Sequence, residues 1–510
     1  MRPIADLHAR ARIAAGLVFL AVLAIDVPLL PSGVSIGDEA EAQTVPYILG
    51  IMHPTGFPLF TLAGWAWSHA LTIGTVAWRM NAFSAVCTAA IAAGVVILAA
   101  AFESGTAAAA FAGLAFAFGA IVWPGAVHIN GQVLSAACSV FALAAAVRFA
   151  RGASPRTLVF AGALCGCGVA AHPSSIWIVP AIAAAAWCRR ADGVQRTLAA
   201  ALVAFALPLL CYAYLPLRGA AITPAGVAAL DGAPPIDPGS LDWEGVPPNT
   251  RAAFFDNVLG SGQHALASVA QAFDPRTYPG AALAWWRMAA GLQYGPVLPL
   301  AALAGAVALG LRDRRALGVV AAGTVGGLLF AYAYRDDTHI DRYYLLSSAV
   351  AAALSAGLTR AFPAERAARY GRPAVAALLA VLAAVALVQN RPDPKPRYLD
   401  DGEAVIAAVR RDTPADAIVV AQWNEASALR YGAFVEGVLG GRTIVAGWPG
   451  AYEEAYPAWR RTRPVFFYVG PLAGRYLFAW AWRVEQWPSS RPPFVVLRVL
   501  PHSVKPKGWP

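Results

Sequence analysis

Apolar and polar residues alternate in long blocks over the first three quarters of the chain. Each apolar block is close to the length of a helix that crosses a membrane, for which roughly 17 to 25 residues are needed. The two blocks that flank His172 and Pro173 are the shortest. We predict about eleven transmembrane helices, one for each of the blocks 13–31, 82–101, 107–123, 132–148, 157–171, 174–188, 197–217, 291–311, 316–334, 343–360 and 373–390.

Basic residues mark every second connection between these blocks. Short loops rich in Lys and Arg stay in the cytoplasm, so each loop tests this positive-inside rule independently. With the N-terminus in the cytoplasm, four further loops that should be cytoplasmic all carry arginine. They hold Arg148, Arg151 and Arg156, then Arg189, Arg190 and Arg196, then Arg312, Arg314 and Arg315, and finally Arg360, Arg366, Arg369 and Arg372. The pattern predicts a cytoplasmic N-terminus and places the other loops outside.

The first apolar block also resembles a secretory signal, because it follows basic residues and precedes Ala40-Glu41-Ala42. It is longer than the usual apolar core of a signal peptide, so we expect an uncleaved first span. The outer loop that follows, residues 32–80, is apolar but broken by prolines and Gly56, which disfavours one continuous span. We expect two short helices there, lying at the membrane interface.

The apolar runs become shorter in the tail, beyond residue 390. They have the length of β-strands at 417–421, 442–447, 465–470 and 494–500, with helical stretches between them. This alternation is typical of a small α/β unit. We therefore predict two domains. Residues 1–390 form an all-α polytopic membrane bundle with outer loops 32–80 and 218–290, and residues 391–510 form an extracytoplasmic α/β domain.

The composition agrees with a multi-pass membrane protein. Hydrophobic residues make up 58% of the 510 residues and charged residues only 13%, whereas soluble domains have about 25% charged residues. The net charge of +10 resides in the loops and forms no basic stripe with interleaved aromatics, so we expect no nucleic-acid partner. The six cysteines lie inside apolar blocks and support no thiolate metal site. Much alanine and short loops point to a bacterial inner membrane.

Carboxylates and histidines gather at the predicted outer edge of the bundle. The first loop places three acids directly after the first span and His53 shortly after them. Few arrangements other than a shared polar site need so many titratable groups at a membrane boundary. The candidates at this edge are Asp38, Glu39, Glu41, His53, His128, Asn130, His172, Asp336, Asp337, His339 and Asp341.

Each candidate also has a simpler explanation. Asp38 and Glu41 are three residues apart, so they share one face of a helix and could merely cap it. His128 and His172 could be hydrogen-bonded groups at helix ends. The Asp336-Asp337 pair could belong to a solvated turn.

Two arginines, Arg218 and Arg342, stand at the same edge, where arginine is otherwise scarce. They could extend toward lipid headgroups, or they could bind a lipid phosphate. The chain has no P-loop, no plausible nucleophile elbow and no HExxH motif, which disfavours ATP-driven, serine-hydrolase and zinc-protease activities. The energy for a synthetic reaction on the outer side would have to be stored in a lipid-linked substrate.

Three segments resemble a known family. They are Gly37-Asp38-Glu39-Ala40-Glu41, Gly50-Ile51-Met52-His53-Pro54-Thr55-Gly56-Phe57-Pro58-Leu59-Phe60 and Arg79-Met80-Asn81-Ala82-Phe83-Ser84-Ala85. They look like the pattern D-x-G-E, G-x-x-H-P-P-G-Y-P-L-Y, R-x-N-x-x-S-A of the protein O-mannosyltransferase-like membrane family, first catalogued as a domain of unknown function. Ala171-His172-Pro173-Ser174 and Tyr214-Leu215-Pro216-Leu217-Arg218 resemble later motifs of that family. The departures, at Ala40, Thr55, Phe57 and Phe60, leave the acids and His53-Pro54 in place.

The resemblance implies a membrane-embedded glycosyltransferase of the C-type superfamily. Such enzymes take a sugar from a polyprenyl phosphate, and their active site lies between the first outer loop and the bundle. Carried over by position, Asp38 is the candidate general base for an acceptor hydroxyl, and Glu41 or Glu39 would assist. The candidate substrate-binding residues are Glu39, His53, Pro54, Arg79, His128, His172, Arg218, Asp337, His339 and Arg342.

The chemistry of transfer from a lipid phosphate agrees with these residues. The phosphate leaves as a stable anion, so the reaction needs no strong general acid but does need positive charge, which Arg218 and Arg342 could supply. One base without a nucleophilic partner favours a single displacement with inversion. A divalent metal held by Asp38 with Asp336 or Asp337 would suit the superfamily. The resemblance to mannosyltransferases argues against one, and we expect no cofactor.

The sequence thus predicts a glycosyltransferase that acts on a protein, lipid or polysaccharide acceptor outside the cytoplasm, in contact with membrane lipids. A transporter or flippase is the main alternative, since intramembrane polar groups also mark pathways. That alternative predicts two related halves, and the chain shows no such internal symmetry. A non-catalytic scaffold whose tail binds partners is the second alternative.

Overall fold

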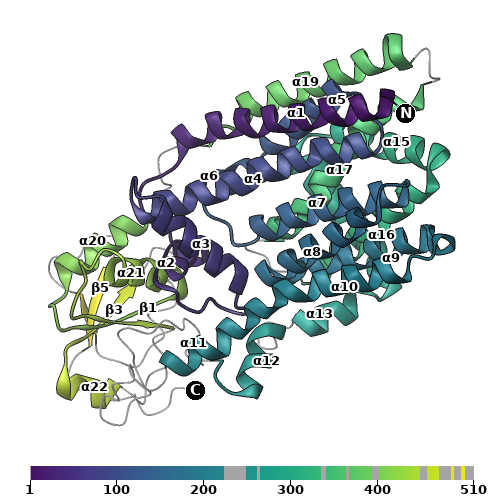
Figure 1. The fold of residues 1–510 in the computed structure, drawn as a ribbon. Coiled ribbons are helices and arrows are strands. Elements are labelled where there is room, and N and C mark those ends of the chain that lie inside the picture. The colour runs from purple at the N-terminus through teal and green to yellow at the C-terminus, as the bar shows by residue number, and fades with distance from the viewer. Residues whose placement is uncertain are drawn as a thin grey trace.

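The computed structural model consists of a helical bundle and a small sheet domain at one end of it (Figure 1). The N-terminus lies at the other end of the bundle. The structure describes residues 2–222, 248–260, 265–334, 340–362, 367–392, 401–447, 456–469, 484–486 and 495–499. Three candidates of the sequence, Asp336, Asp337 and His339, lie outside these described residues.

Every predicted apolar block contains a helix, so the predicted membrane bundle is confirmed. A helix satisfies its backbone hydrogen bonds internally, which is why apolar blocks adopt this structure in lipid. The helices are α1 (Arg2–Asp26), α4 (Val76–Ala101), α5 (Thr106–Ala117), α7 (Val133–Ala150), α8 (Pro155–Ala171), α9 (Val179–Cys188), α10 (Gln195–Leu209), α15 (Val297–Arg312), α16 (Arg314–Tyr334), α17 (Leu345–Gly357) and α19 (Arg372–Gln389).

Only some of these helices are long enough to cross a membrane without a break. Among the described residues, 6 helical stretches meet that length and composition: Ala9–Leu29, Val76–Ala101, Val133–Ala150, Gln195–Ala220, Arg314–Tyr334 and Arg369–Gln389. Four further blocks hold apolar helices of 10–17 residues: Thr106–Ala117, Pro155–Ala171, Pro173–Cys188 and Val297–Arg312. Turns interrupt the blocks, as at η2 (Pro173–Ile178), a 3-10 helix that precedes α9.

Helices α8 and α10 pack closely because α8 carries Gly162 and Gly166, four residues apart. A methyl group on Gly162 would lie 2.3 Å from Ala201 O, and one on Gly166 would lie 2.1 Å from Phe205 O. Small residues at this spacing let two membrane helices approach backbone to backbone. The C-terminal ends of both helices reach the cavity described below.

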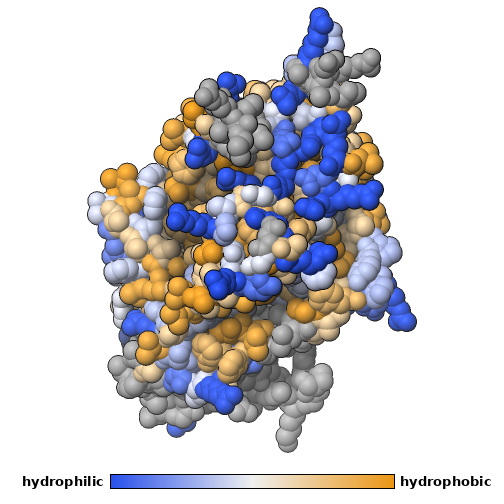
Figure 2. Space-filling view, turned by 45° about the vertical axis from the view of Figure 1, so that its right-hand side comes forward, coloured by the Kyte–Doolittle hydropathy of each residue, from blue (hydrophilic) through white to orange (hydrophobic). Residues whose placement is uncertain are grey.

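Arginine-bearing loops meet at the end of the bundle away from the sheet domain. Arg151 Nε lies 2.7 Å from Asp313 Oδ2, and Arg151 also pairs with Glu103. Arg360 NH1 lies 3.3 Å from Glu103 Oε2. We call these four residues the Glu103 cluster, which joins chain segments that follow α4, α7, α15 and α17. Figure 2 turns this end of the molecule forward and shows hydrophilic side chains gathered on it beside apolar ones.

The two long segments predicted as outer loops also contain helices. Residues 32–80 hold α2 (Gly37–Ile48) and α3 (Pro58–Ala70), the two short helices expected there. The described part of residues 218–290 is helical too, in α11 (Tyr214–Ile222), α12 (Arg251–Leu259), α13 (Ala265–Ala272), η6 (Pro275–Thr277) and α14 (Tyr278–Arg287), with the π-helix η7 (Met288–Gln293) after it. The remaining short elements are η1 (Val27–Leu29), α6 (Val122–Val127), η3 (Arg190–Asp192), η4 (Leu210–Ala213), η8 (Ile340–Tyr344), η9 (Leu358–Ala361) and η10 (Ala367–Gly371).

The C-terminal domain contains a five-stranded mixed sheet in the order β2-β1-β3-β5-β4. Strands β2 and β3 run parallel to β1, whereas β5 runs antiparallel to β3 and to β4. The four predicted runs became β1 (Ile418–Ala421), β2 (Thr443–Ala446), β3 (Val465–Val469) and β5 (Val495–Val499). Strand β4 (Val484–Gln486) was not predicted, since it is too short to show a pattern. Helices α20 (Gly402–Asp412), α21 (Trp423–Phe434) and α22 (Tyr456–Thr462) complete the predicted α/β architecture.

The C-terminal domain is fastened to the first loop through the backbone. Gly402 N donates to Val34 O at 3.0 Å, and Val34 N donates to Glu403 Oε1 at 3.2 Å. Ala77 N, near the start of α4, donates to the Tyr431 hydroxyl at 3.1 Å. Helix α21 therefore packs against α2, the helix that carries the first-loop acids.

Candidate active site

A cavity of about 790 Å³ opens where the first loop, the bundle and the C-terminal domain meet. Asp38 and His53 from the first loop, Arg342 from η8, and Trp423 and Asn424 from α21 line its polar part. Its apolar lining comes from the bundle and includes Val169, Ile176, Trp177, Leu209, Tyr212, Val269 and Phe330. This volume is typical of a small-molecule site. Charged and apolar walls in one cavity suit an amphipathic ligand.

The acids are presented by the N-terminal turn of α2. The helix begins at Gly37, whose φ of +61° is accessible to glycine without strain. Asp38 and Glu39 occupy the first turn, where the helix dipole favours negative charge. The N-cap residue is Ile36, and the Asp38 carboxylate forms its bonds outside the helix. Capping therefore does not explain Asp38.

The two oxygens of the Asp38 carboxylate have donors from different parts of the chain. Arg342 NH1 lies 3.1 Å from Oδ2, and Trp423 Nε1 donates to Oδ1 over 3.2 Å. These partners are 304 and 385 residues away in sequence. The positive charge of Arg342 favours the ionised form of the carboxyl group. Asp38 thus stands at the cavity as a carboxylate of defined orientation.

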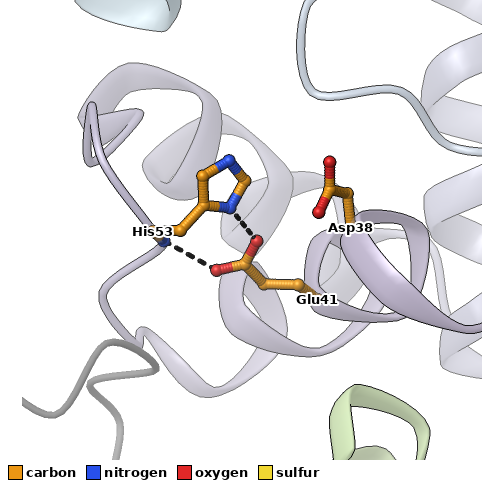
Figure 3. Close-up of side chains that lie close together, drawn as sticks. All are labelled: Asp38, Glu41 and His53. Carbon is orange, nitrogen blue, oxygen red and sulfur yellow. Dashed lines mark hydrogen bonds and ion pairs between the residues drawn. The ribbon is translucent and has the colours of Figure 1, made fainter. Parts of the chain in front are cut away.

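Glu41 is fully buried and holds His53 through two contacts (Figure 3). The backbone N of His53 donates to Glu41 Oε1 at 2.7 Å, and the ring atom Nδ1 bonds the other carboxylate oxygen. Burying a carboxylate is costly unless it is hydrogen-bonded, and here both oxygens are bonded. Figure 3 shows the Asp38 carboxylate beside the ring of His53. Glu41 therefore orients His53 at the cavity without lining the cavity itself.

Asp38, Glu41 and His53 are also the described residues best placed to hold a metal ion. One donor atom of each lies within 4.8 Å of the others, and carboxylate and imidazole groups are ligands for several divalent cations. Glu41 is already bonded to His53, however, and Asp38 to Arg342. A cation would have to displace these partners and would be repelled by the guanidinium. The absence of a metal requirement stays a prediction.

Arg342 also approaches a second acid of α2. Its NH2 lies 4.0 Å from Glu39 Oε1, and the other oxygen of Glu39 lies 3.7 Å from His128 Nδ1. Neither Glu39 nor His128 lines the cavity, but Asn130 and Gln132, shortly after His128, do. Glu39 therefore approaches Arg342 from behind the cavity wall, and His128 approaches Glu39.

His172 follows α8 and lines the cavity beside Phe57. The Phe57 ring lies 5.0 Å from the His172 ring and 5.1 Å from the His53 ring, between centroids. Burial, and to a lesser degree the nearby His53, lowers the pKa of His172 to about 3, so its ring is neutral near pH 7. Phe57 has a φ of +46°, a strained value for a residue other than glycine. In this backbone conformation, the Phe57 ring contacts the rings of both His53 and His172.

Arg218 is not among the residues that line the cavity. It lies in α11, where its Nε donates to Leu49 O at 2.8 Å. The Tyr214 hydroxyl donates to Gly50 O, also at 2.8 Å. Both bonds hold the turn between α2 and His53. The structure therefore brings Arg342 to the predicted acid and uses Arg218 to support the loop.

Two residues of the third family motif support the first loop in the same way. The Arg79 guanidinium donates to four backbone carbonyls, those of Ser68, Thr72, Ile73 and Gly74. Asn81 Oδ1 accepts from Ile129 N at 2.9 Å, and Asn81 Nδ2 donates to Pro31 O at 3.0 Å. Arg79, predicted to bind substrate, is not part of the cavity lining, whereas Pro54 is.

The sequence analysis missed several cavity residues, among them Gln132, Trp423 and Asn424. Trp423 and Asn424 belong to a domain that carries no motif pointing to the site. Gln132 lies just after His128 and Asn130, so its closeness to two polar candidates was the signal that could have revealed it. Gln132 Oε1 is buried without a hydrogen-bond partner and belongs to a residue of the cavity wall.

Comparison with known proteins supports the first-loop motifs. Residues 38–195 match the family model described as the protein O-mannosyl-transferase TMEM260 N-terminal domain. The family resemblance is confirmed. The match begins at Asp38 and includes the first-loop motifs on which the resemblance was based. Protein O-mannosyl-transferase TMEM260 of Mus musculus is 39% identical over 64 residues, which make up 12% of this chain and 9% of the mouse protein.

One solved structure shares the fold over most of the chain. The oligosaccharyltransferase of Archaeoglobus fulgidus in its apo form superposes with a TM-score of 0.53 and 14% identity, covering 91% of this chain and 69% of the archaeal one. Apo ArnT from Cupriavidus metallidurans has a TM-score of 0.44 and 15% identity, covering 96% of this chain and 99% of ArnT. The archaeal likeness confirms the predicted C-type glycosyltransferase fold.

Proposed function

We propose that this protein is a membrane glycosyltransferase that moves a sugar from a polyprenyl phosphate to an acceptor hydroxyl outside the cytoplasm. The cavity is the observation that carries the proposal. It places a carboxylate, Asp38, and a guanidinium, Arg342, on the same wall as the apolar ends of membrane helices. A lipid-linked sugar needs all three: apolar surface for its chain, a cation for its phosphate, and a base for the acceptor.

The step follows from these positions. The Asp38 carboxylate takes the proton of the acceptor hydroxyl while the acceptor oxygen forms a bond to the anomeric carbon. The bond between that carbon and the phosphate oxygen breaks, and the polyprenyl phosphate leaves with the electron pair. A single displacement of this kind inverts the anomeric centre. Positioned general bases contribute about a hundredfold to ten-thousandfold to such rates.

Arg342 is the cation for the leaving phosphate in this scheme. It lines the cavity and pairs with Asp38 at 3.1 Å, whereas Arg218 bonds a backbone carbonyl of the first loop. The phosphodiester of the donor competes with Asp38 for the guanidinium, and the negative charge that develops on the departing phosphate strengthens that contact while Asp38 takes the acceptor proton. The same residue would then serve the donor and release the base.

The orientation predicted by the positive-inside rule supports the proposal. The Glu103 cluster and the other arginine-bearing loops lie at the end of the bundle away from the cavity, and loops rich in arginine remain cytoplasmic. The cavity and the C-terminal domain then face the outer side, in a bacterial inner membrane if the composition is a guide. A donor presented in the outer leaflet would reach the apolar wall directly.

The test is transfer by purified protein carrying Asp38→Asn. The first pairing to try is a polyprenyl phosphate mannose with a peptide rich in Ser and Thr, because the matching family model is described as a protein O-mannosyl-transferase domain. Turnover should fall by about a hundredfold or more, with donor binding retained. Asp416→Asn, an exposed acid of the C-terminal domain, serves as the matched control and should leave turnover unchanged. Full turnover by the Asp38 variant would exclude this acid as the base.

A further inference from the structure

One donor to the Asp38 carboxylate comes from outside the membrane bundle. Trp423 begins α21 in the C-terminal domain, and its indole N–H donates to Asp38 Oδ1 over 3.2 Å. The same indole meets the ring of His53 edge to face, with centroids 6.0 Å apart and planes at 90°. Trp423 thus contacts two residues of the polar cavity wall and is itself part of that wall.

The two donors to Asp38 together define the plane of its carboxylate. Arg342 bonds Oδ2 and Trp423 bonds Oδ1, so rotation about the terminal side-chain bond is restricted at both oxygens. That rotation is otherwise soft for aspartate. Each carboxylate oxygen has two lone pairs, so a hydroxyl can still approach either one. Indole donates without adding a formal charge, and it orients the base while favouring its ionised form.

The C-terminal domain holds Trp423 in place independently of Asp38. Its backbone bonds to Val34 and the Tyr431 bond to Ala77 anchor the domain on both sides of α2. A methyl group on Gly37 would lie 2.8 Å from Asn424 Oδ1, so the start of α21 sits directly against the start of α2. The position of the indole is thus set by the domain as a whole.

We propose that Trp423 is a positioning residue for Asp38, through which the C-terminal domain completes the active site. The inference rests on the proposed function, since it takes Asp38 as the base. It gives the C-terminal domain a direct part in catalysis, in addition to any contact with the acceptor. A merely structural Trp423 would pack against His53 and α2 equally well without its N–H.

The experiment compares Trp423→Phe with Tyr431→Phe in full-length protein. The first removes the N–H donor to Asp38, and the second removes a bond that fastens the same domain but does not touch Asp38. Trp423→Phe should lower kcat about tenfold, as expected for a hydrogen bond to a charged group, and leave the donor KM within about twofold of wild type. Its acidic limb in the kcat/KM profile should move to higher pH, because the carboxylate loses a donor. Tyr431→Phe should change neither.

A double-mutant cycle tests whether the effect passes through Asp38. In an Asp38→Glu background the carboxylate is displaced from the indole, so Trp423→Phe should have almost no additional effect there. If a thermal melt shows that the Trp423→Phe variant is misfolded, a benzothiophene side chain can replace the indole at this position. It keeps the shape of the indole and still removes the N–H. Equal activities of the Trp423→Phe and Tyr431→Phe variants would overturn the inference. So would an equal factor of kcat loss from Trp423→Phe in the wild-type and Asp38→Glu backgrounds. Full activity of Asp38→Asn would instead overturn the proposed function.

Discussion

Two clusters of arginine and carboxylate lie at opposite ends of the bundle, and they differ in charge balance. The Glu103 cluster has two acids and two arginines, and none of the four lines the cavity. Among the described residues, the cavity cluster pairs the acids Asp38, Glu39 and Glu41 with one arginine, Arg342, and with the histidines His53 and His128. A balanced cluster satisfies itself and ties loops together. A cluster that borders a cavity can exchange contacts within the protein for contacts with a ligand.

The largest expected effect is on turnover, and it distinguishes the arginine of the cavity cluster from an arginine of the Glu103 cluster. Arg342→Gln should reduce transfer by about a hundredfold, because the departing phosphate loses its preorganised cation. Arg360→Gln removes an equally half-buried arginine from the Glu103 cluster and should leave turnover per folded molecule within about twofold. Steady-state transfer assays on both purified variants measure this difference in turnover. Equal losses would mean that Arg342 has only a structural part.

The second effect concerns the buried acid. Glu41→Gln keeps the shape of the side chain but loses the charge that bonds His53, so turnover should fall about tenfold with a smaller change in donor KM. His53→Gln should cause a loss of similar size, and the double variant should be no worse than either single one. Independent, multiplying losses would show that the two residues do not act as a pair.

The third effect is on stability alone. Arg151→Gln leaves Asp313 without its partner at 2.7 Å and weakens the hold on Glu103. The apparent melting temperature in detergent should fall by about 3 °C, with specific activity unchanged at low temperature. Lys at position 151 should restore part of the loss. An activity loss that exceeds the loss of folded protein would contradict a purely structural role for the cluster.

The smallest effect is on pH dependence. The folded pKa of His172 lies at about 3, below the unfolded value of 6.5, so the unfolded chain binds more protons between these values. Stability should therefore fall as the pH is lowered from about 6.5 toward 3. His172→Gln should make this decline shallower while leaving the melting temperature at pH 8 less affected. Thermal melts at pH 5 and pH 8 measure the difference.

The sequence predicted those parts of the site that are local. Asp38, Glu41 and His53 lie within 16 residues of one another, in motifs that appear in the sequence itself. Helix blocks and four strands were also predictable, since apolar length decides both. Trp423 was not predictable, because its bond to Asp38 depends on how a second domain packs against α2.

The arginines Arg218 and Arg342 show most clearly what the sequence alone could not predict. Arg218 and Arg342 look alike in the sequence, each at the outer end of an apolar block. Only tertiary packing determines that η8 carries Arg342 to Asp38 while α11 turns Arg218 toward the carbonyl of Leu49. The Glu103 cluster was invisible for the same reason, since positive-inside counting registers arginines but not their acidic partners.

The 385 residues between Asp38 and Trp423 have a consequence for biogenesis. At roughly 5 to 20 residues per second, a ribosome needs roughly 20 to 80 s to make the stretch between them. Asp38 therefore emerges long before Trp423, and the proposed site can assemble only after the domain that carries Trp423 has been synthesised and has folded. A nascent or prematurely terminated chain would carry the family motifs in its first loop yet lack the Trp423 part of the proposed site.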